Sequence, residues 1–132
     1  MTRGVPQVLA RWFAALVLGG LVGAVGTVMH RAFVPWGIAA CLALVLASSV
    51  LTRAWVGLVG LLAYGVGFVV VVQVLSLTGP GGDVLIPAGQ PVGYAWIVGG
   101  MLMVAAGAFA PARSFRDDVP APAATPESGS GP

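Results

Sequence analysis

Apolar residues run through the chain in four long blocks, separated by short polar stretches or by segments rich in glycine and proline. The blocks cover residues 12–29, 33–51, 55–77 and 92–110, to within a residue or two at each end. A helix needs about 20 consecutive apolar residues to cross the hydrocarbon core of a bilayer, and each block approaches that length. The pattern therefore predicts an all-α membrane protein with four transmembrane helices.

The connections between the blocks predict the topology. The short segments HRA (residues 30–32) and TRA (residues 52–54) join the first three blocks, so consecutive helices must form antiparallel hairpins. The one long connection lies between residues 77 and 92. There Val84, Leu85 and Ile86 are too apolar for a freely solvated loop, and Pro91 suits the first turn of a helix. We expect an antiparallel bundle in which this connection forms an ordered outer loop.

The arginines predict the orientation, because Lys and Arg accumulate on the cytoplasmic side of membrane proteins. With the N-terminus inside, five arginines are cytoplasmic: Arg3, Arg11, Arg53, Arg113 and Arg116. Only Arg31 is then outside. Trp12 and Trp55 fall at inner helix ends, and Trp36 and Trp96 fall near outer ends, where indole rings favour the headgroup region. Both termini are therefore expected in the cytoplasm, with the chain in the cell (cytoplasmic) membrane.

Composition supports the membrane assignment. Hydrophobic residues make up 58% of the 132 residues and charged residues only 8%, whereas soluble domains carry about 25% charged residues. The mean hydropathy is +1.00. The net charge of +2 comes without a basic stripe, so no nucleic-acid partner is expected. The single cysteine, Cys41, excludes an internal disulfide.

The two ends of the chain differ in character. The first block follows Arg3 and Arg11 as a signal peptide would, but its apolar core is longer than a signal peptide's and no clear cleavage site follows it. We interpret it as a retained span of a transmembrane domain covering residues 1–111. Residues 112–132 are rich in proline, alanine, glycine and serine and cannot bury apolar area, so they are expected to form a disordered cytoplasmic tail.

Small residues recur at three- or four-residue spacing within the first three blocks. They are Ala15, Gly19, Gly23 and Thr27 in the first, Ala39, Ala43 and Ala47 in the second, and Gly57, Gly60, Ala63 and Gly67 in the third. Such ladders allow helix backbones to approach closely, which matters because lipid provides no hydrophobic drive for helix association. We expect these ladders to pack inside the bundle. A dimer or partner interface is the alternative.

No Asp, Glu, Lys or Arg lies deep in any block, although such residues usually mark transport paths and catalytic sites in membranes. Ser48, Ser49 and Tyr64 are expected to satisfy their hydroxyls within the bundle. A polar cluster is predicted at the outer face, made of His30, Arg31, Gln73, Asp83 and Gln90. One histidine and one acid are too few to specify a metal. We therefore predict no catalytic, cofactor-binding or metal-binding residues.

The segment GGDVLIPAGQPVGYAWIVGG, residues 81–100, carries one resemblance. Within a short four-helix chain that has arginine but no lysine and a proline-rich tail, it resembles a family of small actinobacterial integral membrane proteins of unknown function. The resemblance covers residues 8–111 and implies a four-helix architecture. It implies no catalytic residues.

The leading functional hypothesis is a non-catalytic accessory or scaffold component that acts by helix packing, either against a second copy or against a larger membrane protein. The alternative is a small transporter or channel for a neutral or apolar solute, with a path lined by glycine, serine, Tyr64 and Gln73. An enzyme ranks third, because only His30 and Asp83 offer an acid–base pair. We expect no cofactor, and the lipid bilayer as the surrounding partner.

Overall fold

The computed structural model describes residues 4–77 and 91–111, apart from the side chain of Val92. This part of the chain is all-α, as predicted. Its helices are α1 (Val5–Met29), α2 (Trp36–Val56), α3 (Leu58–Leu77) and α4 (Pro91–Ala108). The first three are long and apolar enough to cross a membrane, whereas α4 is apolar but shorter.

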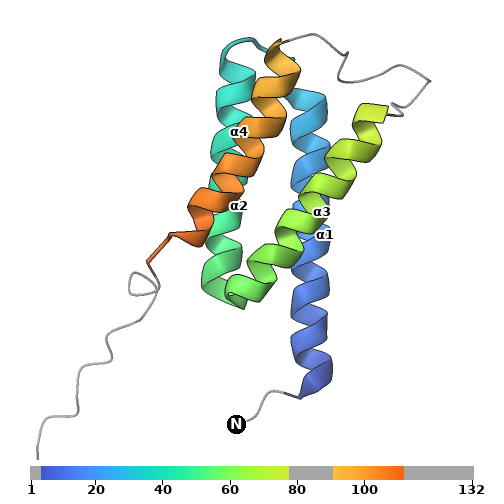
Figure 1. The fold of residues 1–132 in the computed structure, drawn as a ribbon, viewed down its shortest axis with the longest axis vertical. Helices are drawn as coiled ribbons and strands as arrows, with labels where there is room; N and C mark the ends of the chain where they lie inside the picture. Colours follow the sequence, from blue (N-terminus) through green and yellow to red (C-terminus); the bar gives the residue numbers. More distant parts are fainter. Residues whose placement is uncertain (1–3, 78–90, 112–132) are drawn as a thin grey trace, which may run out of the picture.

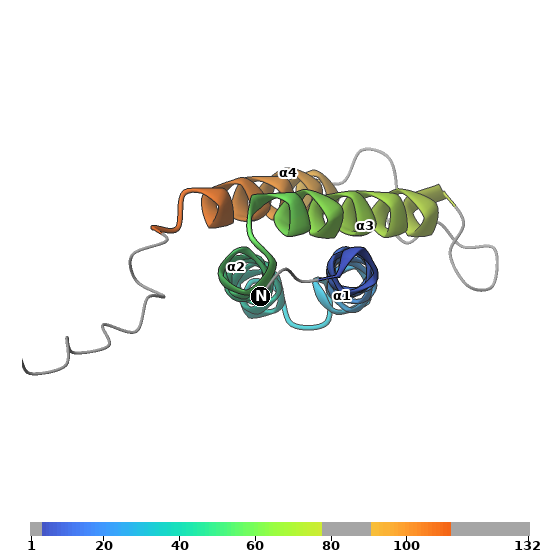
Figure 2. The same cartoon turned by 90° about the horizontal axis from the view of Figure 1, so that it is seen from below.

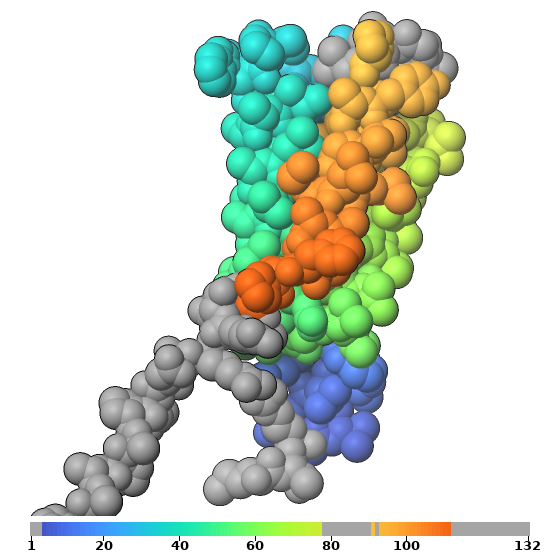
Figure 3. All heavy atoms as spheres, turned by 60° about the vertical axis from the view of Figure 1, so that its left-hand side comes forward, coloured from blue at the N-terminus to red at the C-terminus, as the bar shows by residue number. Residues whose placement is uncertain are grey.

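The helices form two layers. Figure 2 shows α1 and α2 side by side in one layer, with α3 and α4 in the other. Helix α3 packs mainly on α1, and α4 packs mainly on α2. Figure 1 shows α3 crossing α1 at an angle, so the upper ends of α3 and α4 diverge. Figure 3 shows α4 covering one side of the molecule, and the start of α1 extending beyond the α2–α3 turn.

The helix boundaries follow local chemistry. Pro6 lies in the first turn of α1, where its missing N–H costs nothing, and the helix begins at Val5 rather than near residue 12. Pro91 begins α4, as predicted. The α1–α2 connection is longer than the predicted three residues, because the turn continues from His30 to Pro35.

The predicted TRA link between the second and third helices is wrong. Residues 52–54 remain helical within α2, and only Gly57 separates α2 from α3. Gly57 has φ of 87°, a left-handed conformation that a side chain would disfavour. Arg53 is tolerated in the last turn of α2 because a cation interacts favourably with the C-terminal end of a helix. Gly57 therefore ends a helix instead of belonging to a packing ladder.

Close backbone contact joins α1 to α3. A methyl group at Gly19 would overlap the carbonyl oxygen of Tyr64, and one at Gly67 would overlap the carbonyl oxygen of Leu16. At both points the glycine of one helix lies against the main chain of the other. The contact is thus built by glycines from both ladders, as their spacing predicts.

The ladders differ in where they face. The small residues of α1 are buried, and so are the two helical glycines of the α3 ladder: Ala15, Gly19, Gly23, Thr27, Gly60 and Gly67. In contrast, Ala39, Ala43 and Ala47 of α2 are exposed. The buried face of α2 instead carries Cys41, Val45, Ser48, Ser49 and Thr52. The alanine ladder therefore does not take part in packing inside the bundle.

The core contains large aromatic side chains between the layers. Trp96, Tyr64 and Phe68 are almost completely buried, and the rings of Phe68 and Trp96 meet edge to face with centroids 5.8 Å apart. The expected interfacial place of Trp96 is wrong, because its ring is 0% exposed, whereas Trp36 is 79% exposed. Trp96 is buried because Gly26 of α1 leaves room for its ring.

The glycine contact predicts the first mutational result. Gly19→Ala should lower the free energy of unfolding by about 1–3 kcal/mol, because the added methyl group pushes α1 away from α3. Gly19→Leu should lower it further. The measurement is reversible unfolding in detergent micelles.

Gly65→Ala in α3 is the matched control. Its methyl group would meet the Val104 side chain at 3.5 Å, an ordinary contact. It should leave stability unchanged or raise it by up to about 1 kcal/mol through helix propensity. A Gly19→Ala protein as stable as the wild type would contradict the close backbone contact.

Candidate functional site

The structure describes three of the five residues of the predicted outer polar cluster: His30, Arg31 and Gln73. His30 is fully buried at the end of α1, while Arg31 and Gln73 are exposed. Asp83 and Gln90 lie outside the described residues, so the expected pairing of Arg31 with Asp83 stays a prediction. Among the described residues, the partners of the His30 ring are Thr27 and Trp96, and no hydrogen bond joins it to Arg31 or Gln73.

Instead, His30 belongs to a buried polar group with Thr27 and Trp96, called here the Thr27–His30–Trp96 cluster. The indole Nε1–H of Trp96 donates a hydrogen bond of 3.2 Å to the Thr27 hydroxyl. The His30 ring stacks on the Trp96 ring, with centroids 5.7 Å apart and planes 13° from parallel. This cluster joins α4 to the C-terminal end of α1.

Hydrogen bonding fixes the tautomer of His30. Its Nδ1 lies 2.8 Å from the carbonyl oxygen of Thr27, one turn earlier in the chain. A carbonyl can only accept, so Nδ1 carries the proton, and in a neutral ring Nε2 then presents a lone pair. Nε2 is buried and has no hydrogen-bond partner among the described residues. Nε2 of His30 is therefore the ring nitrogen of the cluster that has no hydrogen-bond donor among the described residues.

A second polar group lies deeper in the bundle. The hydroxyls of Ser48 and Tyr64 share a hydrogen bond of 2.6 Å between α2 and α3. Ser48 also donates to Leu44 O at 2.7 Å, and Ser49 to Leu46 O at 2.8 Å. The expectation that these hydroxyls are satisfied within the bundle is confirmed.

Side-chain hydrogen bonds also link α2 to α4 and form within α2. Ser49 approaches Met103 O at 3.3 Å, and Thr52 donates to Ser48 O at 2.7 Å. Each of these hydroxyls thus ends on a main-chain carbonyl. A hydroxyl held this way stabilises a fold and is poorly placed as a nucleophile, which needs a base beside it.

The described residues include few side chains that could bind a metal or act as an acid or base. Within residues 4–77 and 91–111, no three His, Cys, Asp or Glu side chains gather closely enough to hold a metal ion. All four acids of the sequence lie outside these ranges: Asp83, Asp117, Asp118 and Glu127. In the described part of the chain, His30 is accordingly the only residue among His, Asp, Glu and Lys, and the other side chains that could exchange a proton are Cys41, Tyr64 and Tyr94.

Sequence reasoning missed Trp96 as a partner of His30. The spacing of Thr27 and His30 indicates that the imidazole can reach a carbonyl one turn back in the helix. Nothing in the spacing connects either residue to Trp96, which follows 69 positions after Thr27. Only the packing of α4 against the bundle reveals the cluster.

Comparison with protein-family models, with curated proteins and with solved structures finds no match for this chain. The resemblance to small actinobacterial membrane proteins stays a prediction. The function must therefore be inferred from the chain's own surfaces and buried groups.

The Thr27–His30–Trp96 cluster predicts that two similar Thr→Val substitutions change the free energy of unfolding by different amounts. Thr27→Val should lower the free energy of unfolding by about 1–2 kcal/mol, because it leaves the buried indole N–H of Trp96 without an acceptor. The control is Thr52→Val, equally buried. It should cost less than about 0.5 kcal/mol, since the Thr52 hydroxyl bonds only within its own helix. Equal losses in unfolding experiments would contradict the interhelical bond.

Proposed function

We propose that this protein is a multi-pass integral membrane protein that acts without catalysis, as an accessory or scaffold component that packs its helices against a partner. The observation that carries this proposal is the outward-facing ladder of Ala39, Ala43 and Ala47 on α2. The partner is a larger membrane protein or a second copy of the chain.

The membrane part of the proposal is supported by the surface. Large apolar side chains are exposed on every helix, among them Phe13, Leu51, Leu62 and Leu102. An aqueous surface does not tolerate apolar area of this extent, whereas lipid does. Three helices meet the length and hydropathy of membrane spans. We infer that α4 forms the fourth span together with the residues that follow it.

The packing part rests on a contrast between helices. Gly19 of the α1 ladder and Gly67 of the α3 ladder are already engaged in the contact between these two helices. The ladder of α2 has the four-residue spacing of the α1 ladder but faces outward. In a bilayer, small residues on a helix surface allow a second helix to approach closely, and van der Waals contact then holds the pair. An exposed ladder is thus suited to another transmembrane helix.

The absence of catalysis is inferred from chemistry. The buried hydroxyls of α2 are bonded to carbonyls or to Tyr64, and the described chain contains no carboxylate to activate them. A nucleophile needs an adjacent base, and proton transfer needs a positioned donor and acceptor. These features favour a structural role.

The proposed orientation has both termini in the cytoplasm. Its support is that Arg11 and Arg53 lie at the end of the bundle where α1 begins and α2 meets α3, while Arg31 lies in the opposite turn. The excess of arginine marks the cytoplasmic side.

Cysteine labelling tests this orientation. In a Cys41→Ser background, Phe33→Cys should react with a membrane-impermeant maleimide on intact cells, because Phe33 lies exposed in the α1–α2 turn. Gly4→Cys, at the start of α1, should react only after permeabilisation. The reverse pattern would show that the N-terminus is outside.

The packing proposal is tested by purifying the tagged chain from its native membrane in mild detergent and weighing the intact complexes by mass spectrometry. The wild type should retain a stoichiometric partner or a second copy. Ala43→Leu should reduce that retention several-fold, because a bulky side chain blocks close helix approach. Its unfolding free energy should stay within about 0.5 kcal/mol of the wild type, since Ala43 faces outward.

The matched control is Ala106→Leu, an exposed alanine of α4 outside the ladder. It should retain the partner. A wild-type chain that is purely monomeric, with nothing copurifying, would count against the accessory role. Equal loss of the partner in both variants would remove the ladder from the interface.

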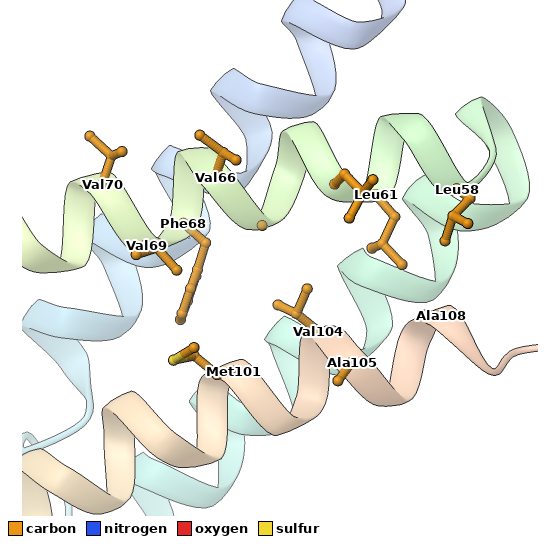
Figure 4. Close-up of a pocket in the computed structure, with 12 residues that line it drawn as sticks. Leu58, Leu61, Val66, Phe68, Val69, Val70, Met101, Val104, Ala105 and Ala108 are labelled. Carbon is orange, nitrogen blue, oxygen red and sulfur yellow. The ribbon is translucent and has the colours of Figure 1, made fainter.

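One observation favours the alternative, a small transporter or channel for an apolar solute. A groove of about 450 Å³ lies between α3 and α4. Figure 4 shows Leu61, Phe68, Met101 and Val104 directed towards it. Neither Tyr64 nor Gln73, which the sequence predicts to line the path, lines this groove: the Tyr64 hydroxyl is bonded to Ser48, and Gln73 is exposed. A homodimer that carries a retained apolar molecule through the same purification would favour this alternative.

A further inference from the structure

A pocket of mixed character lies where the start of α1 meets the α2–α3 junction. Its volume is about 330 Å³, and it is lined by Val8, Arg11, Trp12, Val56, Leu58 and Val59. This end of the bundle carries Arg11 and Arg53, and the orientation proposed above places it at the cytoplasmic surface of the membrane. The pocket combines one cation with apolar walls.

Arg11 lies beside an aromatic ring but has no carboxylate partner among the described residues. The guanidinium carbon of Arg11 lies 5.6 Å from the centre of the Trp55 ring, within the range of a cation–π interaction. A cation–π interaction is an electrostatic attraction to the ring and supplies no lone-pair acceptor for the five N–H donors of the guanidinium. Among the described residues, no hydrogen bond or ion pair engages them. Arg11 is thus held in place with its donors unused.

The surroundings of Arg11 match an amphiphile. Trp12 and Trp55 are exposed, as expected of indoles at the headgroup level. Val8, Val56 and Val59 give the pocket apolar walls next to the cation. A phospholipid presents the same pair of features, a phosphate at the surface and acyl chains immediately below it.

We propose that this pocket binds an anionic phospholipid. The phosphate accepts hydrogen bonds from the edge of Arg11, and the upper part of one acyl chain lies along Val8, Val56 and Val59. Arginine suits this role because its planar donors match phosphate oxygens in pairs. The site needs only a membrane surface at this end of the bundle, so it does not depend on the proposed partner of α2.

The test is native mass spectrometry of the purified full chain, mixed with phosphatidylglycerol or phosphatidylcholine of identical acyl chains. The wild type should retain phosphatidylglycerol about fivefold more strongly, the preference expected of one arginine near a membrane surface. Arg11→Gln should lose the preference. Arg11→Lys should keep part of it, because the charge remains but the paired donors do not.

Arg31→Gln is the charge-matched control, since Arg31 is exposed at the opposite end of the bundle. It should retain the preference for phosphatidylglycerol. A melting experiment separates lipid from free anion: phosphatidylglycerol should raise the Tm of the wild type but not of Arg11→Gln, and inorganic phosphate should raise neither.

Three results would overturn the proposal. They are equal retention of the two lipids by the wild type, an equal loss of preference in Arg11→Gln and Arg31→Gln, and a Tm increase reproduced by inorganic phosphate alone. Because each is read on the isolated chain, a failure here is distinct from a failure of the accessory role.

Discussion

The glycine-mediated contact between α1 and α3 is the constraint on which the rest of the structure depends. Gly19 and Gly67 let each helix touch the main chain of the other, at Tyr64 and Leu16 respectively. In lipid, where burying apolar surface brings no gain, close van der Waals packing of this kind is a principal source of helix association. The pair fixes the crossing of α3 over α1. It also sets which face of α3 turns towards α2.

The interhelical hydrogen bonds follow from that crossing. With α3 held on α1, Tyr64 points into the bundle and its hydroxyl meets Ser48 of α2. Helix α4 is attached separately, through Trp96 on Thr27 and His30 at one end and through the Ser49 contact with Met103 O further along. Because α3 packs mainly on α1 and α4 mainly on α2, a groove remains between α3 and α4.

This division of contacts shapes the functional inference. Hydroxyls inside the described bundle are bonded to main-chain carbonyls of their own helix or, at Ser48, Ser49 and Thr27, to a neighbouring helix. Three surfaces of the described helices bear on function: the alanine ladder of α2, the α3–α4 groove and the pocket beside Arg11. The first suits another helix, the second an apolar molecule and the third an amphiphile with a negative headgroup.

The sequence by itself determined the helical class, the number of helices, the start of α4 at Pro91 and the local bonds of Ser48 and Ser49. These depend on block length, on proline chemistry and on carbonyls one turn away. Only the tertiary structure decided that Ala43 faces outward while Gly19 is buried, that Trp96 is a core residue, and that α2 runs on to Gly57. In a water-soluble helix, polarity marks the outer face. Here lipid and core are both apolar, so hydrophobicity does not distinguish residues that face the lipid from residues that face the core. The fit between helices alone determines which face of each helix is buried.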